Sequence, residues 1–289
     1  MSRKQGSVLI VTLLATALLS SVAIAQATHV SLELKWANRL QESRQAWALA
    51  WTGVQAAAQE LALDPTPNWD APKENWGQVS QDPIHLPKGK FQVRILDEQA
   101  RIPLNSASLE LVAQLPGFSI SSANALISRR KEGKALAHLG ELLLLDGFQA
   151  AALPELEPLV TLYGNGPVNV NTASAAVLTR LGCSTALASQ IVQFRAGADG
   201  RWGTADDEIF PDVAQIAPLM ETQFGPLLPE DQTTLGNLIS SQQIGVRSSF
   251  FQVEAEGWTD AHGIYQKVIA VMERSEPNSK PEVRGWYEA

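Results

Sequence analysis

The sequence predicts an α+β protein in which a long N-terminal helix leads into an antiparallel sheet that a large α-helical region interrupts. Three observations support this prediction. Neither proline nor glycine occurs from Ser7 to Thr52. Apolar and polar residues alternate at 91–96 and again in two runs after residue 248. Between these strand patterns, residues 106–240 show the apolar spacing of helices.

The first segment is predicted to be a membrane helix. Residues 7–27, SVLIVTLLATALLSSVAIAQA, carry no ionisable side chain and have roughly the 20-residue length that a bilayer-spanning helix requires. Three fates remain open for this segment. A signal peptidase could cut at the A-x-A-like stretch AIA at 23–25, the anchor could stay uncut, or cleavage between Gly6 and Ser7 could leave the apolar helix at the mature N-terminus.

The chain after residue 27 is predicted to continue the same helix. Apolar residues at spacings of three or four mark one face of it, namely Leu32, Trp36, Leu40, Trp47, Trp51, Val54, Ala58 and Leu61. The combined rod ends before Pro65 and is on the order of 85 Å long at 1.5 Å per residue. An apolar stripe on a rod that leaves a membrane favours contact with partner helices. The candidate interface residues are Trp36, Leu40, Trp47, Trp51 and Val54.

Strand patterns lie on both sides of the helical middle region. After a loop rich in proline, asparagine and glycine, FQVRIL at 91–96 indicates a half-buried strand. Near the C-terminus, SFFQVEAEGW and IYQKVIAVMER are separated by TDAHG, which predicts a hairpin with Gly263 in the turn. The final VRGWYEA can add a short strand. The middle region is expected to lack strands, and LGELLLL at 139–145 is expected to be helical within it.

The most chemically specific stretch is GADGRWGTADDEIFPD at 197–212. Calcium takes six to eight oxygen ligands at about 2.3–2.6 Å, and a glycine-containing loop with several carboxylates can provide them. The candidate ligands are Asp199, Asp206, Asp207 and Glu208, whereas Asp212 is a candidate N-cap for a helix that begins near residue 213. The spacing is not that of an EF-hand, so a solvated loop without a metal remains the alternative.

Two segments resemble helix-hairpin-helix units, LPGFSISSANALISRR and VNVNTASAAVLTRLGCSTALASQIVQFR. The form that binds DNA uses Gly-hydrophobic-Gly, which lets the backbone approach a phosphate. Here the hairpins are Gly-Phe-Ser and Gly-Cys-Ser, so the second glycine is missing. A net charge of -8 also opposes binding to phosphates. We therefore expect scaffolding hairpins and no nucleic-acid partner, and keep a membrane-anchored DNA receptor of the competence type as the alternative function.

No catalytic constellation emerges from the sequence. The histidines at 29, 85, 138 and 262 have no partner at zinc-like spacing, and neither a G-x-S-x-G elbow nor a phosphate loop occurs. The single cysteine, Cys183, excludes an intrachain disulfide and is expected to be a buried structural thiol. We therefore expect no enzymatic activity, and a calcium-dependent periplasmic enzyme is the weakest of the candidate functions.

These features together resemble a family. A short basic leader ending in Gly6, followed by an apolar helix that becomes amphipathic, is similar to type IV pilins and type II secretion pseudopilins. Most members carry glutamate at the fifth mature position, where this chain has Val11. The K-type minor pseudopilin usually lacks that glutamate, and it resembles an ordinary pseudopilin interrupted by a helical domain. Where the family commonly shows Asn-Leu-Asn after the first strand, this chain has Pro103-Leu104-Asn105.

The resemblance to the K type (the general secretion pathway protein K family) implies an organisation. It comprises a prepilin leader (1–6), a transmembrane helix (7–27), its periplasmic continuation (28–64), the first part of the pseudopilin sheet (65–105), an inserted α-helical domain (106–240) and the second part of the sheet (241–289). It also implies that a prepilin peptidase cuts between Gly6 and Ser7, that the new N-terminus is methylated, and that the helical domain binds Ca²⁺.

The resemblance also implies a location and partners. The chain would cross the bacterial inner membrane once, with its N-terminus cytoplasmic before processing and its bulk in the periplasm. Its partners would be I-type and J-type minor pseudopilins, other pseudopilus subunits, the peptidase, inner-membrane lipid and, as a further expectation, secreted cargo. Its function would be to start or cap the pseudopilus at the tip and so support export of folded proteins.

Overall fold

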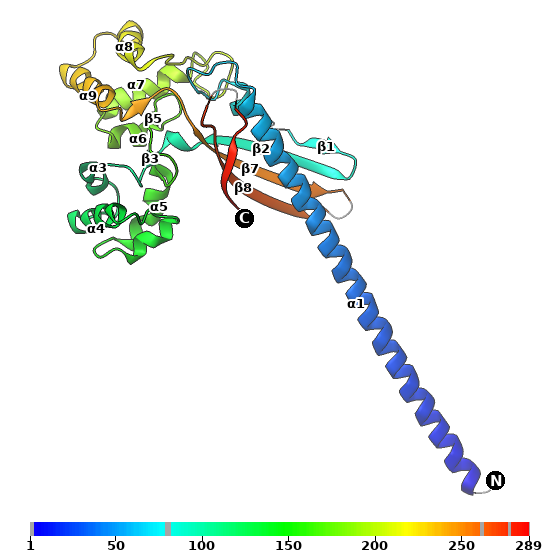
Figure 1. Cartoon of the computed structure of the whole chain (residues 1–289). Helices are drawn as coiled ribbons and strands as arrows, with labels where there is room; N and C mark the ends of the chain where they lie inside the picture. The colour runs from blue at the N-terminus through cyan, green and yellow to red at the C-terminus, as the bar shows by residue number, and fades with distance from the viewer. Residues whose placement is uncertain (1–2, 79–81, 261–262, 277–278, 289) are drawn as a thin grey trace.

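The computed structural model describes residues 3–78, 82–260, 263–276 and 279–288. The first two residues of the predicted leader, and Ala261 and His262 of the predicted hairpin turn, lie outside the described residues. Three parts make up the molecule: a rod, a sheet seated on the upper half of the rod, and a helical region beyond one end of the sheet (Figure 1). The expected α+β class is thus confirmed.

The rod is a single helix, α1, Arg3–Ala62. It contains one stretch that is long and apolar enough to cross a membrane by length and composition. Every side chain from Val8 to Gln41 is exposed, whereas the last turns of α1 lie against the sheet. The rod ends three residues before Pro65, as predicted, because a proline disfavours helical backbone in the residue before it.

The main sheet has five antiparallel strands in the order β1-β2-β7-β8-β9. Their bounds are β1 (Ile84–Leu86), β2 (Gly89–Asp97), β7 (Phe250–Thr259), β8 (Tyr265–Glu273) and β9 (Glu282–Glu288). The predicted strand at 91–96, the C-terminal hairpin and the final strand are all present. Gly263 follows β7 with φ +62°, a left-handed conformation that glycine adopts at little cost.

One face of the sheet packs on α1 and forms a core. Alternate residues of β2 and β7 point into it, as the two-residue period of a strand requires. Two glycines allow the close approach of helix and sheet. A Cβ added at Gly53 would lie 2.6 Å from Val93 Cγ2, and one at Gly257 would lie 2.2 Å from the carbonyl oxygen of Ala46. The buried members of this core include Ala50, Val54, Leu61, Phe91, Val93, Phe251, Val253 and Met272.

The helical region lies between β2 and β7 in the chain and has its own larger core. Its helices are α3 (Leu109–Ala113), α4 (Ile120–Lys131), α5 (Leu153–Leu156), α6 (Ala175–Arg180), α7 (Thr185–Arg195), α8 (Ile216–Phe224) and α9 (Pro229–Ser240). Four of these helices begin at a serine whose side chain accepts a hydrogen bond from a backbone N–H of the first turn, at Ser108, Ser119, Ser174 and Ser184.

Short 3-10 helices and strands complete the fold. The 3-10 helices are η1 (Glu98–Ala100), η2 (Leu139–Leu144), η3 (Ala150–Ala152), η4 (Glu157–Leu159) and η5 (Val213–Gln215). The remaining strands form two parallel pairs, β3 (Ile102–Pro103) with β4 (Val160–Thr161), and β5 (Val168–Asn169) with β6 (Ile244–Gly245). One four-residue helix, α2 (Asn75–Gln78), follows the rod.

Three sequence predictions about local structure were wrong. The middle region does contain strands, β4 and β5, but two residues are too few to produce a two-residue period. Residues 139–144 form the 3-10 helix η2, because only part of the leucine run enters the core and the rest is exposed. Strand β1 lies within the expected loop, and all three of its residues are exposed at the sheet edge.

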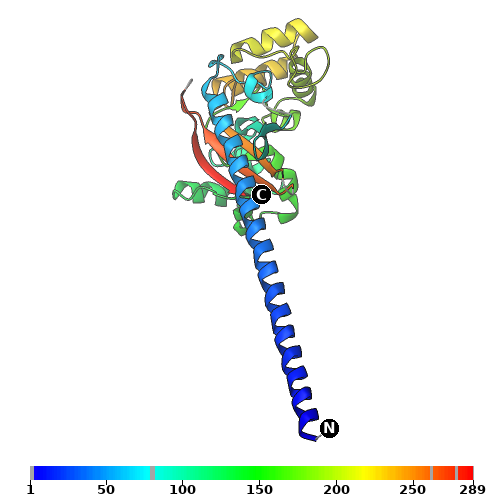
Figure 2. The same ribbon diagram turned by 90° about the vertical axis from the view of Figure 1, so that its right-hand side faces the viewer.

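The parts are arranged along the axis of the rod. Figures 1 and 2 both show the free half of α1 projecting away from the folded body, with α8 and α9 at the opposite end. The helical region also extends sideways beyond the sheet in Figure 1, so the molecule is much wider at this end than at the rod.

Candidate functional site

The predicted processing site lies at the start of the rod. Gly6 and Ser7 are both within α1, so their backbone is helical.

The predicted partner-helix interface divides into two parts. Trp36 and Leu40 lie on the free half of α1, and 70% of the Trp36 surface is exposed. Val54 is fully buried against the chain's own sheet and therefore cannot contact a partner helix in this fold. The apolar stripe is continuous in sequence, but the sheet covers its C-terminal part.

Trp47 and Trp51 belong to an aromatic cluster at the edge of the sheet. Their rings stack at 5.7 Å with an interplanar angle of 7°. Trp286, from β9, packs edge-on against both rings, at 6.2 Å and 5.7 Å. Half of the Trp286 surface is exposed. The cluster is therefore an internal contact with one open side, and Trp286 is a member that the sequence pattern of the rod could not have included.

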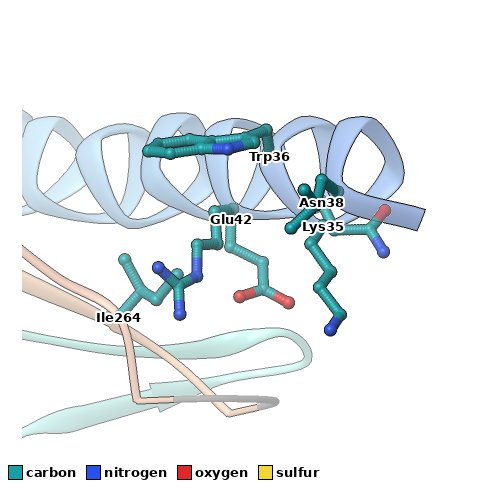
Figure 3. Close-up of a pocket in the computed structure, with 7 residues that line it drawn as sticks. Lys35, Trp36, Asn38, Glu42 and Ile264 are labelled. Carbon is teal, nitrogen blue, oxygen red and sulfur yellow. The ribbon is translucent and has the colours of Figure 1, made fainter. Parts of the chain in front are cut away.

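A groove runs between the free half of α1 and the turn that follows β7. Its volume is about 720 Å³. Figure 3 shows the side chains of Lys35 and Glu42 extending from the side of the rod on which Ile264 lies. The groove is lined by Leu32, Lys35, Trp36, Asn38, Arg39, Glu42 and Ile264. It mixes apolar surface with charges of both signs, which suits the polar face of another helix better than a small apolar ligand.

The acidic loop, residues 197–212, joins α7 to η5. Three of its predicted ligands converge on one hydroxyl: Thr204 Oγ1 donates to Asp206 Oδ1 at 2.7 Å and lies 3.1 Å from Asp207 Oδ1 and 3.4 Å from Asp199 Oδ1. The Thr204 hydrogen bond and backbone N–H donors hold the pKa of Asp206 below its usual range. Three carboxylates with a shared centre are a hard-oxygen donor set of the kind that Ca²⁺ prefers.

The other acidic residues of the loop have different roles. The Glu208 side chain is exposed, and no hydrogen bond among the described residues joins its carboxylate to the other three; its backbone N–H donates to the Arg195 carbonyl. Asp212 caps η5 by accepting a hydrogen bond from the Ala214 N–H at 2.8 Å, which is the alternative role expected for it.

Two cations that the sequence analysis missed anchor the loop. Lys73 Nζ, from the segment after the rod, donates to the Asp207 backbone carbonyl at 2.7 Å. Arg195 is 2% exposed, and its guanidinium donates to the carbonyls of Val170 and Ala173 and lies 4.9 Å from the centre of the Trp202 ring. Burial lowers the pKa of Arg195 to about 9, which the nearby Asp207 partly opposes.

The first hairpin joins α3 to α4 and is covered by the chain itself. Gly117 has φ +80°, and its carbonyl accepts a hydrogen bond from the Gln149 N–H at 2.9 Å. The Phe118 ring packs edge-on against Phe148 at 5.1 Å. Residues 147–152 thus pack against the hairpin within the chain's own fold.

The second hairpin joins α6 to α7 and is also closed. Ser184 Oγ donates to the buried carboxylate of Asp231, from α9, at 3.1 Å. Burial and this carboxylate raise the pKa of Cys183 to about 11. A negative side chain therefore stands beside the hairpin amides, where it would repel a phosphate, and Cys183 is a buried thiol, as predicted.

Three consecutive basic residues, Arg129, Arg130 and Lys131, end α4 and are partly used within the fold. Arg129 pairs with Glu141, and Arg130 donates to the Ala107 carbonyl at 2.7 Å. Only the Arg129 charge is paired by these contacts, and Lys131 is exposed.

Comparisons with known proteins agree with this architecture. A family model described as a helix-hairpin-helix motif matches residues 97–161, which contain the first hairpin. No curated protein sequence matches the chain. A chain in the crystal structure of the GspK-GspI-GspJ complex from the enterotoxigenic Escherichia coli type 2 secretion system matches with a TM-score of 0.56 and 17% identity. This match covers 90% of the present chain and 99% of that chain.

The structural match extends from the rod through the sheet and the helical region, since nearly all of both chains takes part. The expected resemblance to type II secretion minor pseudopilins is thereby confirmed at the level of the fold. The chain has the fold of a subunit of the GspK-GspI-GspJ complex, with a helix-hairpin-helix motif in its inserted helical region.

Proposed function

We propose that the chain is a K-type minor pseudopilin at the tip of a type II secretion pseudopilus, where it starts or caps assembly together with I-type and J-type subunits. The observation that supports this most is the combination of one continuous rod with a sheet that a helical region interrupts, which aligns over 90% of the chain with a subunit of a minor pseudopilin complex. In this role the protein makes contacts and catalyses no reaction.

The shape supports a position at the tip. The helical region widens the end of the molecule opposite the free rod (Figure 1). A broad head would obstruct a subunit above it, while the exposed stripe at Trp36 and Leu40 would remain open to helices from neighbours at the same level or below. Val11, in place of the usual glutamate, is compatible with a subunit that has no neighbour above it.

The proposal includes a topology. The apolar part of α1 would hold the chain in the bacterial inner membrane, with the folded body in the periplasm. The leader would be removed by a prepilin peptidase between Gly6 and Ser7, and the new N-terminus would be methylated.

The acidic loop would hold Ca²⁺. Asp199, Asp206 and Asp207 would supply carboxylate oxygens, and their convergence on the Thr204 hydroxyl supports this donor set. Bound Ca²⁺ would neutralise three like charges and hold the loop in one conformation.

The test is the mature N-terminus. The full-length chain should be produced in cells with and without a prepilin peptidase, and its intact mass and N-terminal sequence should be determined from isolated membranes. We expect an N-terminus at Ser7 only when the peptidase is present. The Gly6→Leu variant should remain uncut in both kinds of cell. An N-terminus at Gln26, or an uncut chain in both cells, would contradict the proposal.

A further inference from the structure

The rod, the sheet and the helical region meet at one buried cluster of charged side chains. The segment after the rod, residues 63–78, crosses this meeting point, and we call it the strap. Asp64, Asp70 and Glu74 come from the strap, Asp97 ends β2, and Arg274 follows β8. All five side chains are buried, with Arg274 completely enclosed.

The strap continues the rod and contacts both the helical region and the sheet. The Asp70 N–H donates to the Val246 carbonyl at 2.8 Å, and Asn169, in β5, donates to the Asp70 carbonyl at 3.0 Å. Trp76 packs edge-on against Phe251 of the sheet at 5.3 Å. Undocking the strap would therefore loosen the helical region from both the sheet and the rod.

The cluster contains more negative than positive charge. Arg274 donates to Asp64 Oδ2 at 2.7 Å and to Asp70 Oδ1 at 2.5 Å, so one guanidinium serves two carboxylates. Asp97 has no cation but accepts four hydrogen bonds, from the Gln99 N–H and the side chains of Asn169, Thr172 and Ser248. Burial raises the pKa of Asp97 above its usual range, and these four hydrogen bonds oppose that effect.

Glu74 has neither the guanidinium partner of Asp64 and Asp70 nor as many hydrogen-bond donors as Asp97. Within the described residues it forms no ion pair; it accepts hydrogen bonds from the Ala71 N–H at 2.8 Å, from Trp76 Nε1 at 3.0 Å and from the Thr66 hydroxyl. Carboxylate oxygens of Asp64, Asp70 and Glu74 lie within 4.8 Å of one another. Three buried carboxylates this close repel one another unless one of them is neutral.

The neighbouring carboxylates favour the neutral, protonated form of Glu74. Asp64 and Asp70 face it from the strap itself, and Arg274 pairs with both of these aspartates. Asp97 adds a further negative charge next to Asp70. Lys73, the cation next in sequence, is turned away to the Asp207 carbonyl.

A proton on Glu74 would complete an existing chain of hydrogen bonds. Glu74 Oε1 is in contact with the Thr66 hydroxyl, and that hydroxyl lies 3.2 Å from Asp64 Oδ1. Protonated Oε1 could donate to Thr66 Oγ1, which could then donate to Asp64, whose other oxygen receives Arg274. Glu74 Oε2 would still accept from Ala71 and Trp76.

We propose that this cluster is a proton-sensitive joint, in which a proton held at Glu74 favours the docked strap and its loss weakens the attachment of the helical region to the sheet and rod. Burial supports this assignment because it raises the pKa of Glu74 to about 7 and that of Asp70 to about 6. The inference does not depend on the proposed function, since it uses only the chain's own contacts.

The direction of the pH effect follows from linkage. The docked strap binds the proton more tightly than the undocked one, whose glutamate would have a pKa near its ordinary value of 4.5. Docking is therefore fully favoured below about pH 4.5 and weakens as the pH rises towards 7, by up to about tenfold in the opening equilibrium per pH unit for one proton. Above 7 no further change is expected from this group.

The test is hydrogen exchange of the strap in the full-length protein in detergent, with excess EGTA, between pH 5 and 8. After correction for the intrinsic exchange rate, we expect strap protection to fall from pH 5 to 7, by up to about tenfold per pH unit for each proton released, and then to level off, while α4 stays constant. In Glu74→Gln, whose amide can keep the contacts of both oxygens by donating to Thr66, strap protection should change less than about twofold between pH 6 and 8. A fall below pH 6 should remain, because burial also raises the pKa of Asp70, to about 6. The control Glu110→Gln, at an exposed glutamate, should behave like the wild type.

Several results would overturn the proposal. Constant protection of the wild-type strap from pH 5 to 8 would contradict the proposal, whether or not the Glu74→Gln variant folds. If Glu74→Gln folds and its strap protection falls with pH as steeply as in the wild type, the proposal is also contradicted. A third arm adds Mg²⁺ or Ca²⁺ at pH 8 to an Asp206→Asn protein, which lacks a main ligand of the acidic loop. Protection restored there by the metal would identify the cluster as a cation site instead.

Discussion

At the scale of single residues, the fold depends on a few buried charges. Arg274 is the only cation that pairs with Asp64 and Asp70 among the described residues, and it also lies 5.0 Å from the centre of the Phe251 ring. Removing one partner of a buried ion pair leaves an uncompensated charge in a medium of low polarity, which costs far more than the loss of a solvated surface pair.

Arg274→Met should therefore lower the free energy of unfolding by about 3–5 kcal/mol, measured by urea unfolding of the full chain in detergent. The matched control is Arg284→Met, because Arg284 pairs with Glu273 and Glu282 at an exposed position. We expect far less effect there. A similar loss in both variants would show that Arg274 acts through something other than its buried ion pairs.

The acidic loop gives a second prediction at the residue scale. Asp206→Asn removes one carboxylate charge from the set around Thr204, so it should weaken Ca²⁺ binding at least about tenfold by isothermal titration calorimetry, given the oxygen charge that Ca²⁺ sites require. Asp212→Asn is the control, because Asp212 caps η5 and asparagine is an equally good cap. Equal affinities in the wild type and Asp206→Asn would contradict the proposed ligand set.

At the scale of elements, the seating of the rod on the sheet depends on glycine. A Cβ at Gly53 would meet side chains of both β2 and β7 at 2.6–3.3 Å. Helix propensity alone would favour alanine there by about 1 kcal/mol, so the glycine is explained by close packing.

Gly53→Ala should destabilise the protein by about 1–3 kcal/mol through overpacking. Gly236→Ala is the opposite case, because Gly236 lies within α9 and an added Cβ would meet nothing within 4 Å. It should stabilise the protein by about 0.5–1 kcal/mol. Thermal unfolding of both variants measures the two changes in stability. If both variants were destabilised, or both stabilised, packing would be excluded as the cause.

The free half of the rod gives the second prediction at this scale. Replacing Trp36 and Leu40 together by alanine removes exposed apolar surface without touching either core. Binding to I-type and J-type subunits should weaken by about tenfold or more, as expected for an aromatic anchor, with unchanged thermal unfolding. Leu34→Ala, at an equally exposed position about 200° around the helix from Trp36, should bind normally. Copurification with the two partners measures both.

At the scale of the whole molecule, the folded body and the free rod are energetically separate. No side chain from Val8 to Gln41 is buried, whereas Ala46, Leu49 and Ala50 enter the core. The body thus contains two cores, one on each side of the joint at the strap, and neither includes the membrane-helix segment.

A chain that begins at Thr28 should therefore fold, with a free energy of unfolding within about 1 kcal/mol of the full chain, as is usual for changes at exposed positions. A chain that begins at Thr52 loses core residues of the rod and should be destabilised by several times that amount. Urea unfolding of the two truncated proteins makes the comparison. Failure of the first to fold would show that the membrane segment contributes to the body.

The sequence by itself determined the rod, the C-terminal hairpin and the fold class. Each depends on local patterns: an unbroken run of helix formers that stops before Pro65, and alternating residues around a glycine turn. Local sequence did not determine which residues of the apolar stripe are buried. Val54 and Trp36 look alike in the helical pattern, but only the sheet, formed by residues far along the chain, decided that Val54 is buried and Trp36 exposed.

The tertiary structure alone decided the charged joint and the geometry of the acidic loop. Arg274 is 210 residues from Asp64 and 204 from Asp70, so no spacing in the sequence could have paired them. In the sequence the acidic loop was recognisable as five clustered carboxylates. Some of them converge on Thr204 and one caps a helix. These separate roles depend on backbone turns and on Lys73 from another part of the chain. Local periodicity specifies elements, whereas burial, which sets the energies of charges, exists only once distant segments have come together.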